Sequence, residues 1–69
     1  MWRKRRKAFL THEEGLVLKY LIGTSLQDKQ IAYKLGVSTP TVRTHAGKVY
    51  RKYRVGGRLE LIMRLLGRE

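Results

Sequence analysis

The chain has 69 residues, which is enough for one domain around one small hydrophobic core. Sixteen Lys and Arg stand against five Asp and Glu, so the formal net charge is +11. The chain contains no Cys, which excludes a disulfide scaffold and a thiolate metal site. Hydrophobic residues make up 42% of the chain, close to the share of a globular protein, so the composition favours an ordered fold despite the charge.

No segment of the sequence is apolar enough to cross a membrane. The longest uninterrupted apolar runs, such as Leu16–Leu18, are three residues long, whereas a spanning helix needs about 20 apolar residues. The basic residues 1–7 are similar to the start of a signal peptide, but Ala8–Leu10 is too short for the apolar region that follows in such peptides. We therefore expect no membrane partner and a cytoplasmic location.

The basic residues are unevenly distributed along the chain. Residues 1–7 contain five of them, and the block from Lys29 to Arg58 contains eight, with no acidic residue in either stretch. A long stretch of one charge sign favours a polyanionic partner, and nucleic acid is the class that fits best. Charge alone also allows an anionic membrane surface, or a solvated basic surface without a specific partner.

The hydrophobic pattern and the turn signals predict four short helices in residues 10–69, preceded by a flexible basic arm in residues 1–9. The first helix is expected from about Thr11 to Ile22. Thr11 can cap its start, and Glu14 stands at the spacing of a capping box. The predicted fold class is therefore all-α, in a single four-helix domain.

The second and third helices are separated by a tight turn. The second is expected at about Asp28–Leu35, with Gly36 as its stop. The third begins at Ser38-Thr39-Pro40, where a hydroxyl cap followed by proline in the first turn is a strong start signal, and it runs to about Arg54. Four residues at helical spacing form its predicted buried stripe: Val42, Ala46, Val49 and Tyr53.

The fourth helix is expected from about Arg58 to Leu66 and carries two apolar stripes. The stripe that we assign to the core consists of Leu59, Ile62, Met63 and Leu66. Leu61 and Leu65 form the second stripe, which a core of this size cannot easily bury as well. A helix that is apolar on two sides indicates a partner surface, so Leu61 and Leu65 are candidate contacts with a partner.

Two helices joined by a tight turn, with a basic and polar outer face on the second, are typical of a helix-turn-helix motif. The major groove of DNA, about 12 Å wide, admits one helix. Arg43 is the best candidate base reader, because its guanidinium can bind both acceptors of guanine, and Thr44 can contact a thymine methyl group or hydrogen-bond. Gly47 permits close approach. The candidate phosphate-binding residues are Thr41, Lys48, Arg51 and Arg54.

These segments together resemble the LuxR/FixJ-type, or GerE-like, helix-turn-helix domain of bacterial transcription regulators. The family's opening pattern is matched by Leu10, Thr11, Glu14, Val17 and Leu18. Its central pattern is matched by Ile31, Ala32, Leu35, Val37 and Ser38, and then by Thr41, Val42, Arg43 and His45. Its closing pattern is matched by Val49, Lys52, Val55 and Arg58, so the resemblance covers about Leu10 to Ile62.

The resemblance implies a four-helix domain whose third helix enters the major groove of double-stranded DNA. It also implies a homodimer formed through the fourth helix, which makes Leu61 and Leu65 the candidate dimer contacts. It implies base reading at Arg43, Thr44 and Gly47. RNA polymerase and a full-length relative are the further partners considered. Most members carry an upstream receiver or ligand-binding domain, which does not fit into residues 1–9. We therefore expect either an excised output domain or a free-standing regulator.

The sequence departs from the family pattern on both sides of the helix-turn-helix. One extra residue lies in the turn at 23–27, and Gln27 stands where the family usually has a Ser or Thr cap. We therefore expect Ser25 or Asp28 to cap the second helix instead. At the end of the third helix, Arg54 occupies a position where the family commonly has Gly.

Catalysis, metal binding and cofactor binding are not expected. The sequence offers no convincing Ser-His-acid or paired-carboxylate arrangement, and two His without Cys are too few for a metal site. His45 lies at the edge of the buried stripe, where a structural or phosphate-facing role is expected. The first functional hypothesis is sequence-specific DNA binding as a transcription regulator. The alternatives are a protein-interaction module that pairs with and modulates a full-length relative, and nonspecific nucleoid or RNA binding.

Overall fold

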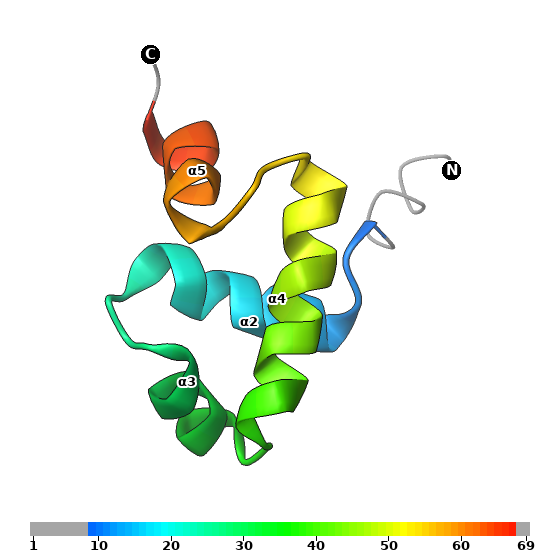
Figure 1. Ribbon diagram of the computed structural model, residues 1–69, viewed down its shortest axis with the longest axis vertical. Coiled ribbons are helices and arrows are strands. Elements are labelled where there is room, and N and C mark those ends of the chain that lie inside the picture. Colours follow the sequence, from blue (N-terminus) through cyan, green and yellow to red (C-terminus); the bar gives the residue numbers. More distant parts are fainter. Residues whose placement is uncertain (1–8, 68–69) are drawn as a thin grey trace.

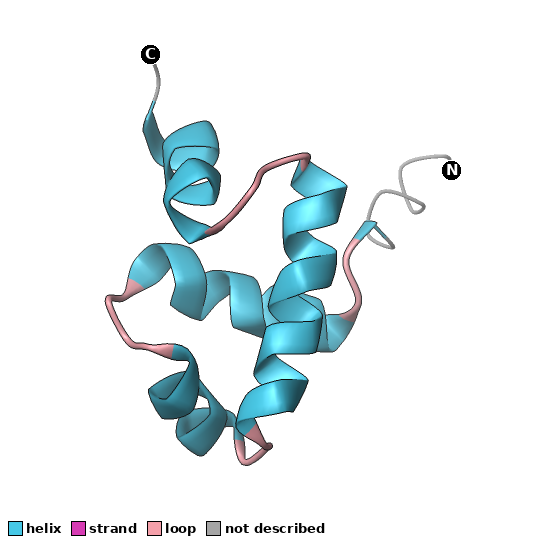
Figure 2. Cartoon of the chain, in the orientation of Figure 1, coloured by secondary structure: helices cyan, strands magenta, loops and turns pink. Residues whose placement is uncertain are grey.

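The computed structural model describes residues 9–67, and every regular element in this range is helical (Figure 1, Figure 2). In chain order these are α2 (His12–Gly23), α3 (Asp28–Leu35), α4 (Thr39–Tyr53) and α5 (Arg58–Ile62), followed by the π-helical turn η2 (Met63–Gly67). The all-α prediction is confirmed. Within this range no helix has the length and apolar character that crossing a bilayer requires. Residues 1–8 of the predicted basic arm lie outside the described residues.

The start of α2 is closed by the capping box that the sequence predicted. The backbone N–H of Glu14 donates to Thr11 Oγ1 at 3.1 Å, and the backbone N–H of Thr11 donates to Glu14 Oε1 at 3.0 Å. These reciprocal bonds satisfy amide groups that a helix start otherwise leaves without partners. The first helix therefore begins at a position fixed by its own local sequence.

The start of α3 corrects one prediction, and its end confirms another. The N-cap is Gln27, not Ser25 or Asp28. The backbone N–H of Gln27 donates to Gln30 Oε1 at 2.8 Å, so a side chain three residues further on satisfies this amide without a hydroxyl cap. At the other end Gly36 adopts left-handed backbone angles, φ 72° and ψ 31°, and stops the helix as expected.

The hydrophobic core lies where α4 packs against the other helices. α2 lies between α3 and α5, and α4 crosses it (Figure 1). The buried core residues are Val17, Leu21, Ile31, Ala32, Val42, Ala46, Val49 and Leu61. Three of the four residues that we predicted for the buried stripe of α4 are among them, and Tyr53 is half-buried beside them. Because this stripe is buried in the core, the opposite side of α4 faces solvent.

The rotation of the last helix differs from the prediction. We assigned Leu61 to an exposed stripe, but its side chain is completely buried in the core. We assigned Leu59, Met63 and Leu66 to the core, but they are 70%, 61% and 58% exposed. The assignment of Leu61 to a dimer contact is therefore wrong, because its side chain is already used to hold the monomer together. Leu65 remains on the exposed side.

Two features of this segment explain its rotation. The guanidinium of Arg58 bonds to carbonyl groups of α2 and of the connection to α3, and this anchors the first turn of α5. Leu61 lies three residues later on the same side and therefore packs inward. At Met63 the helix changes from α- to π-helical hydrogen bonding, which shifts the phase of the side chains that follow. The expected uninterrupted α-helix to Leu66 is thus not formed.

Candidate nucleic-acid interface

The outward face of α4 carries the residues that the sequence analysis selected. Arg43, Thr44, Lys48, Arg51 and Arg54 are exposed. Thr41 and Gly47 are partly covered, and the opposite side of the same helix is buried in the core. The structure therefore brings the predicted base-reading and phosphate-binding positions onto one accessible, cationic surface of a single helix.

The strongest candidate base reader, Arg43, has an acidic neighbour that the sequence analysis did not identify as its partner. Arg43 Nε lies 3.4 Å from Asp28 Oδ2, at the first residue of α3. The side chain of Arg43 is 69% exposed, and that of Asp28 is 35% exposed. Burial raises the pKa of Tyr50, and the nearby Asp28 carboxylate adds to this rise. Asp28 therefore lies against the side of α4 that carries Arg43.

The surface around Gly47 is occupied by a side chain from the next turn. A Cβ atom at Gly47 would meet Arg51 Nη1 at 3.9 Å, which is ordinary van der Waals contact. The Arg51 guanidinium thus lies back along the helix, beside the position that has no side chain of its own. The middle of α4 therefore has no protruding side chain at Gly47 and carries the positive charge of Arg51.

The start of α4 is capped by hydroxyl groups. Ser38 Oγ accepts from the backbone N–H of Thr41 at 3.3 Å and lies 2.8 Å from Thr41 Oγ1. Pro40 stands in the first turn, as the sequence predicted. The hydroxyl group of Thr41 is therefore next to the cap and within hydrogen-bond distance of the Ser38 hydroxyl.

The end of α4 is formed by Arg54 in a left-handed conformation, with φ 59° and ψ 47°. This conformation is strained for a residue with a Cβ atom, by about 1–2 kcal/mol, and glycine adopts it most easily. The chain therefore keeps a cation at an exposed helix end where a glycine would fit with less strain.

Lys52 belongs to the structural side of α4. Its Nζ atom donates to Glu14 Oε1 at 2.7 Å, and Glu14 is 3% exposed. The bond from Lys52, together with the bond from the backbone of Thr11, holds the pKa of Glu14 below its usual range, although burial opposes this effect. This partly buried ion pair connects the start of α2 to the end of α4.

Phe9 extends the domain by one residue at its start. Its ring packs edge-on against Tyr53, with centroids 5.4 Å apart, and its centroid lies 6.0 Å from Lys52 Nζ. We had assigned Phe9 to the flexible arm, and this contact instead fixes it beside the end of α4.

The sequence predicts Arg58 at the start of the fourth helix but not the role of its side chain, which the structure shows. Its Nε donates to the carbonyl of Leu21 at 2.9 Å, and its Nη2 donates to the carbonyls of Tyr20 at 3.1 Å and Thr24 at 2.6 Å. Its Nη1 donates to the carbonyl of Leu26. The guanidinium thus satisfies carbonyl groups at the C-terminal end of α2, where the last turn has no basic residue of its own.

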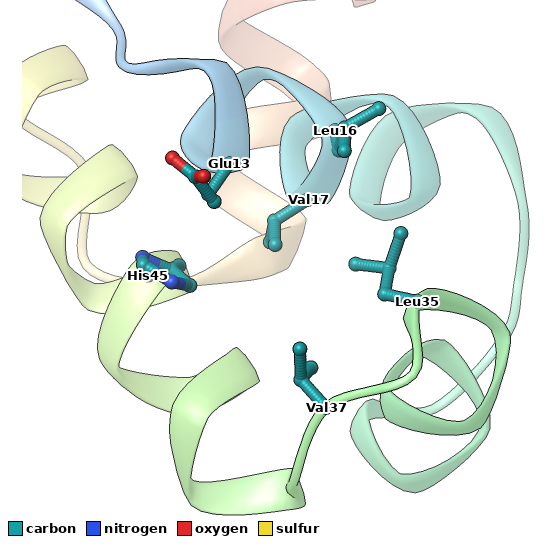
Figure 3. Close-up of a pocket in the computed structure, with 6 residues that line it drawn as sticks. All are labelled: Glu13, Leu16, Val17, Leu35, Val37 and His45. Atoms are coloured by element: carbon teal, nitrogen blue, oxygen red, sulfur yellow. The ribbon is translucent and has the colours of Figure 1, made fainter.

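His45 faces the inside of the domain. It lines a small pocket of about 80 Å³ between α2, the end of α3 and α4 (Figure 3). Glu13 lies next to His45 at one side of the pocket, and Leu35 lies at the other (Figure 3). Among the described residues His45 Nδ1 is buried without a hydrogen-bond partner. The position agrees with a structural role and not with a contact on the outer face of α4.

The chain is similar to known bacterial regulatory proteins. The family described as "Bacterial regulatory proteins, luxR family" (GerE) matches residues 8–65. The chain is 37% identical over 62 residues to the transcriptional regulatory protein YdfI of Bacillus subtilis (strain 168), a match that covers 90% of this chain and 29% of that protein. No solved structure matches the chain at a significant level. Because the family match covers most of the chain and agrees with the helix-turn-helix described above, the chain belongs to the luxR family of bacterial regulatory proteins.

Proposed function

We propose that the chain binds double-stranded DNA sequence-specifically, as the DNA-binding part of a transcription regulator. The observation that carries the proposal is the division of α4 into two sides. Val42, Ala46 and Val49 are buried, whereas the opposite side exposes three cations and the exposed Arg54 follows directly after the helix. The major groove, about 12 Å wide, admits one helix, and a cationic face flush with the helix surface fits between its phosphate walls. Such a regulator works in the compartment that holds the chromosome, which for a bacterial protein is the cytoplasm.

The first turns of α4 carry the proposed base readers. The fork of Arg43 suits the O6 and N7 acceptors of guanine, and Thr44 suits a thymine methyl group or a hydrogen bond. Gly47 lets the helix approach closely. We expect Arg43→Ala to cost about 1–3 kcal/mol of binding free energy and to relax the preference at one base pair.

Lys48, Arg51 and Arg54 are the proposed phosphate contacts, with Thr41 and Ser38 at the helix start. Contacts to phosphate position the protein without reading sequence. Each of Lys48→Ala and Arg51→Ala should therefore weaken binding to all duplexes alike and reduce the slope of log K against log salt by about 0.9. Lys19→Ala, which removes an exposed cation from α2, is the control and should leave the slope nearly unchanged.

The second element of the proposal is a homodimer formed through the exposed apolar face of α5 and η2. This face consists of Leu59, Met63, Leu65 and Leu66. A row of exposed large apolar side chains on a domain this small is a typical protein–protein contact. A twofold dimer would place its two α4 helices on half-sites about 10–10.5 base pairs apart.

The test is a titration of the chain with duplexes selected from a random pool, repeated at several salt concentrations. Sequence-specific, salt-dependent binding supports the proposal. If the chain binds no duplex DNA at low salt but still pairs with a full-length relative, the interaction-module alternative is correct. If it binds all duplexes and RNA equally, the binding is nonspecific.

A further inference from the structure

One acidic side chain lies beside the proposed DNA-reading face of α4. Asp28 is the only acidic residue between Glu14 and Glu60 in the sequence. Its Oδ2 atom lies 3.4 Å from Arg43 Nε, while Arg43 stays 69% exposed. A carboxylate next to a surface that binds phosphates weakens the nonspecific attraction of that surface to DNA. We therefore ask what Asp28 contributes beside the best candidate base reader.

We propose that Asp28 is a positioning residue that sets the sequence specificity of Arg43. The inference rests on the proposed function. According to this proposal, Asp28 holds Arg43 in the orientation that reads guanine. It also keeps the Arg43 guanidinium from binding DNA phosphates, which are present in every sequence.

The geometry of the guanidinium supports this role. An arginine can present either its Nε edge or its two terminal nitrogens to a partner. Asp28 forms its ion pair on the Nε side, so Nη1 and Nη2 remain for an end-on, bidentate contact with the O6 and N7 atoms of guanine. An arginine held in this way has fewer orientations to lose when it binds its base.

The ion pair between Asp28 and Arg43 also opposes a contact between Arg43 and a phosphate. If Arg43 turned to a phosphate, it would leave the Asp28 carboxylate unpaired close to the negatively charged backbone of the DNA. The repulsion is stronger in the complex than in free solution, because docking removes water between the charges. In the free protein the same exposed pair contributes little to stability. The effect of Asp28 is therefore expected in sequence discrimination and not in folding.

The test compares Asp28→Asn with Glu13→Gln. Both acids lie in the first turn of a helix, and both changes raise the net charge by one. Wild type and both variants are used to select duplexes from a random pool, and the dissociation constants for the selected duplex and for a scrambled duplex are then measured at one salt concentration. Thermal unfolding is recorded for each variant.

We expect Asp28→Asn to bind the scrambled duplex more tightly and to lose about threefold to tenfold in preference at the base pair that Arg43→Ala also relaxes. Glu13→Gln should keep the wild-type preference at every position, and both variants should unfold near the same temperature. In the double variant Asp28→Asn/Arg43→Ala, the Asp28 change should cause no additional loss of preference.

Two results would overturn the inference. Asp28→Asn could keep the wild-type preference, or it could change the preference at a base pair different from the one read by Arg43. In both cases wild type still selects a sequence, so the proposed function stands and only the role of Asp28 is rejected. If wild type selects no sequence at all, the proposed function fails, and this inference fails with it.

Discussion

Two turns flank α4: residues 36–38 lead into it, and residues 54–57 lead out of it toward α5. The first turn is built from local chemistry, with Gly36 in the left-handed conformation and Ser38 capping the next helix. In the second turn the left-handed position is held by Arg54, and α5 starts after Gly57 without a side-chain cap in the described structure. The entry to α4 is thus fixed by neighbouring residues. The exit combines a local bond, from the backbone N–H of Gly56 to Glu60 Oε1, with the contacts that Arg58 and Leu61 make to distant parts of the chain.

Leu61→Ala is the strongest test of this difference. Leu61 is completely buried and attaches α5 to the core. Removing its branched side chain should lower the free energy of unfolding by about 2–5 kcal/mol. In the matched control, Leu59→Ala, the residue is 70% exposed, so the change should stay within about 0.5 kcal/mol. Urea unfolding of both variants checks the prediction, and equal losses would show that α5 is rotated differently.

Arg58→Gln tests the second contact that holds α5 in place after the exit turn, the contact between the Arg58 guanidinium and residues 20–26. Its guanidinium donates to four carbonyl groups in α2 and the following turn, and a glutamine reaches fewer of them. We expect a loss of about 2–3 kcal/mol, because carbonyl groups at the end of α2 lose charged donors. Arg64→Gln is the control, since Arg64 donates to a single exposed carbonyl, that of Tyr53. Thermal unfolding should separate the two variants clearly.

The same contrast explains what the sequence could and could not predict. The starts of α2 and α4 and the end of α3 were predicted correctly, because Thr11, Ser38 and Gly36 act on residues within four positions of themselves. The rotation of α5 was predicted wrongly, because two apolar stripes on one short helix do not reveal which one meets the core.

The candidate site shows the same division. The cationic face of α4 follows from helical spacing alone, so its residues could be selected from the sequence. The contact between Asp28 and Arg43 joins two different helices across a turn, and the contact of Lys52 with Glu14 spans 38 residues. No local sequence pattern predicts either pair, because each pair forms only when the helices pack against each other.

Lys52→Met tests the ion pair that holds the end of α4 against α2. At pH 7 we expect a loss of about 1–3 kcal/mol, because the buried Glu14 carboxylate loses its charged donor. The pKa of Glu14 is below its usual range in the folded protein, so its contribution to stability is complete at neutral pH. That contribution is lost as the pH falls below about 4–5 toward the lowered pKa.

The pH dependence distinguishes this pair from a general change of charge. In Lys52→Met the largest cause of the lowered pKa is gone, so the variant should lose less stability than wild type between about pH 5 and pH 3. The stability difference between the two proteins should therefore shrink on acidification. Lys19→Met removes an exposed cation, and its difference from wild type should change less over the same range. Unfolding curves at several pH values provide the measurement.

The two left-handed helix ends should respond in opposite directions to matched substitutions. Gly36→Ala adds a Cβ atom at φ 72°, where no neighbouring atom lies within 4 Å, so its cost of about 1 kcal/mol is backbone strain alone. Arg54→Gly removes the strain at φ 59° and should raise the free energy of unfolding by about 1 kcal/mol. The stabilised variant should also bind duplex DNA more weakly, if Arg54 contacts a phosphate. A stabilised variant with unchanged DNA binding would remove Arg54 from the proposed phosphate contacts.

The smallest effect on the monomer and the clearest effect on assembly are expected from Leu59→Lys. Leu59 contributes little to the core, so a charged side chain there should change the free energy of unfolding of the monomer by no more than about 0.5 kcal/mol. In a dimer that buries this face, two introduced lysines would have to lose their water and approach each other across the twofold axis. Sedimentation of wild type and Leu59→Lys over a range of concentrations should therefore show a weaker dimer for the variant.

The binding of Leu59→Lys to a single DNA half-site should not weaken, because α4 is unchanged. If both proteins associate equally, the apolar face of α5 and η2 is not the surface through which two copies of the chain associate.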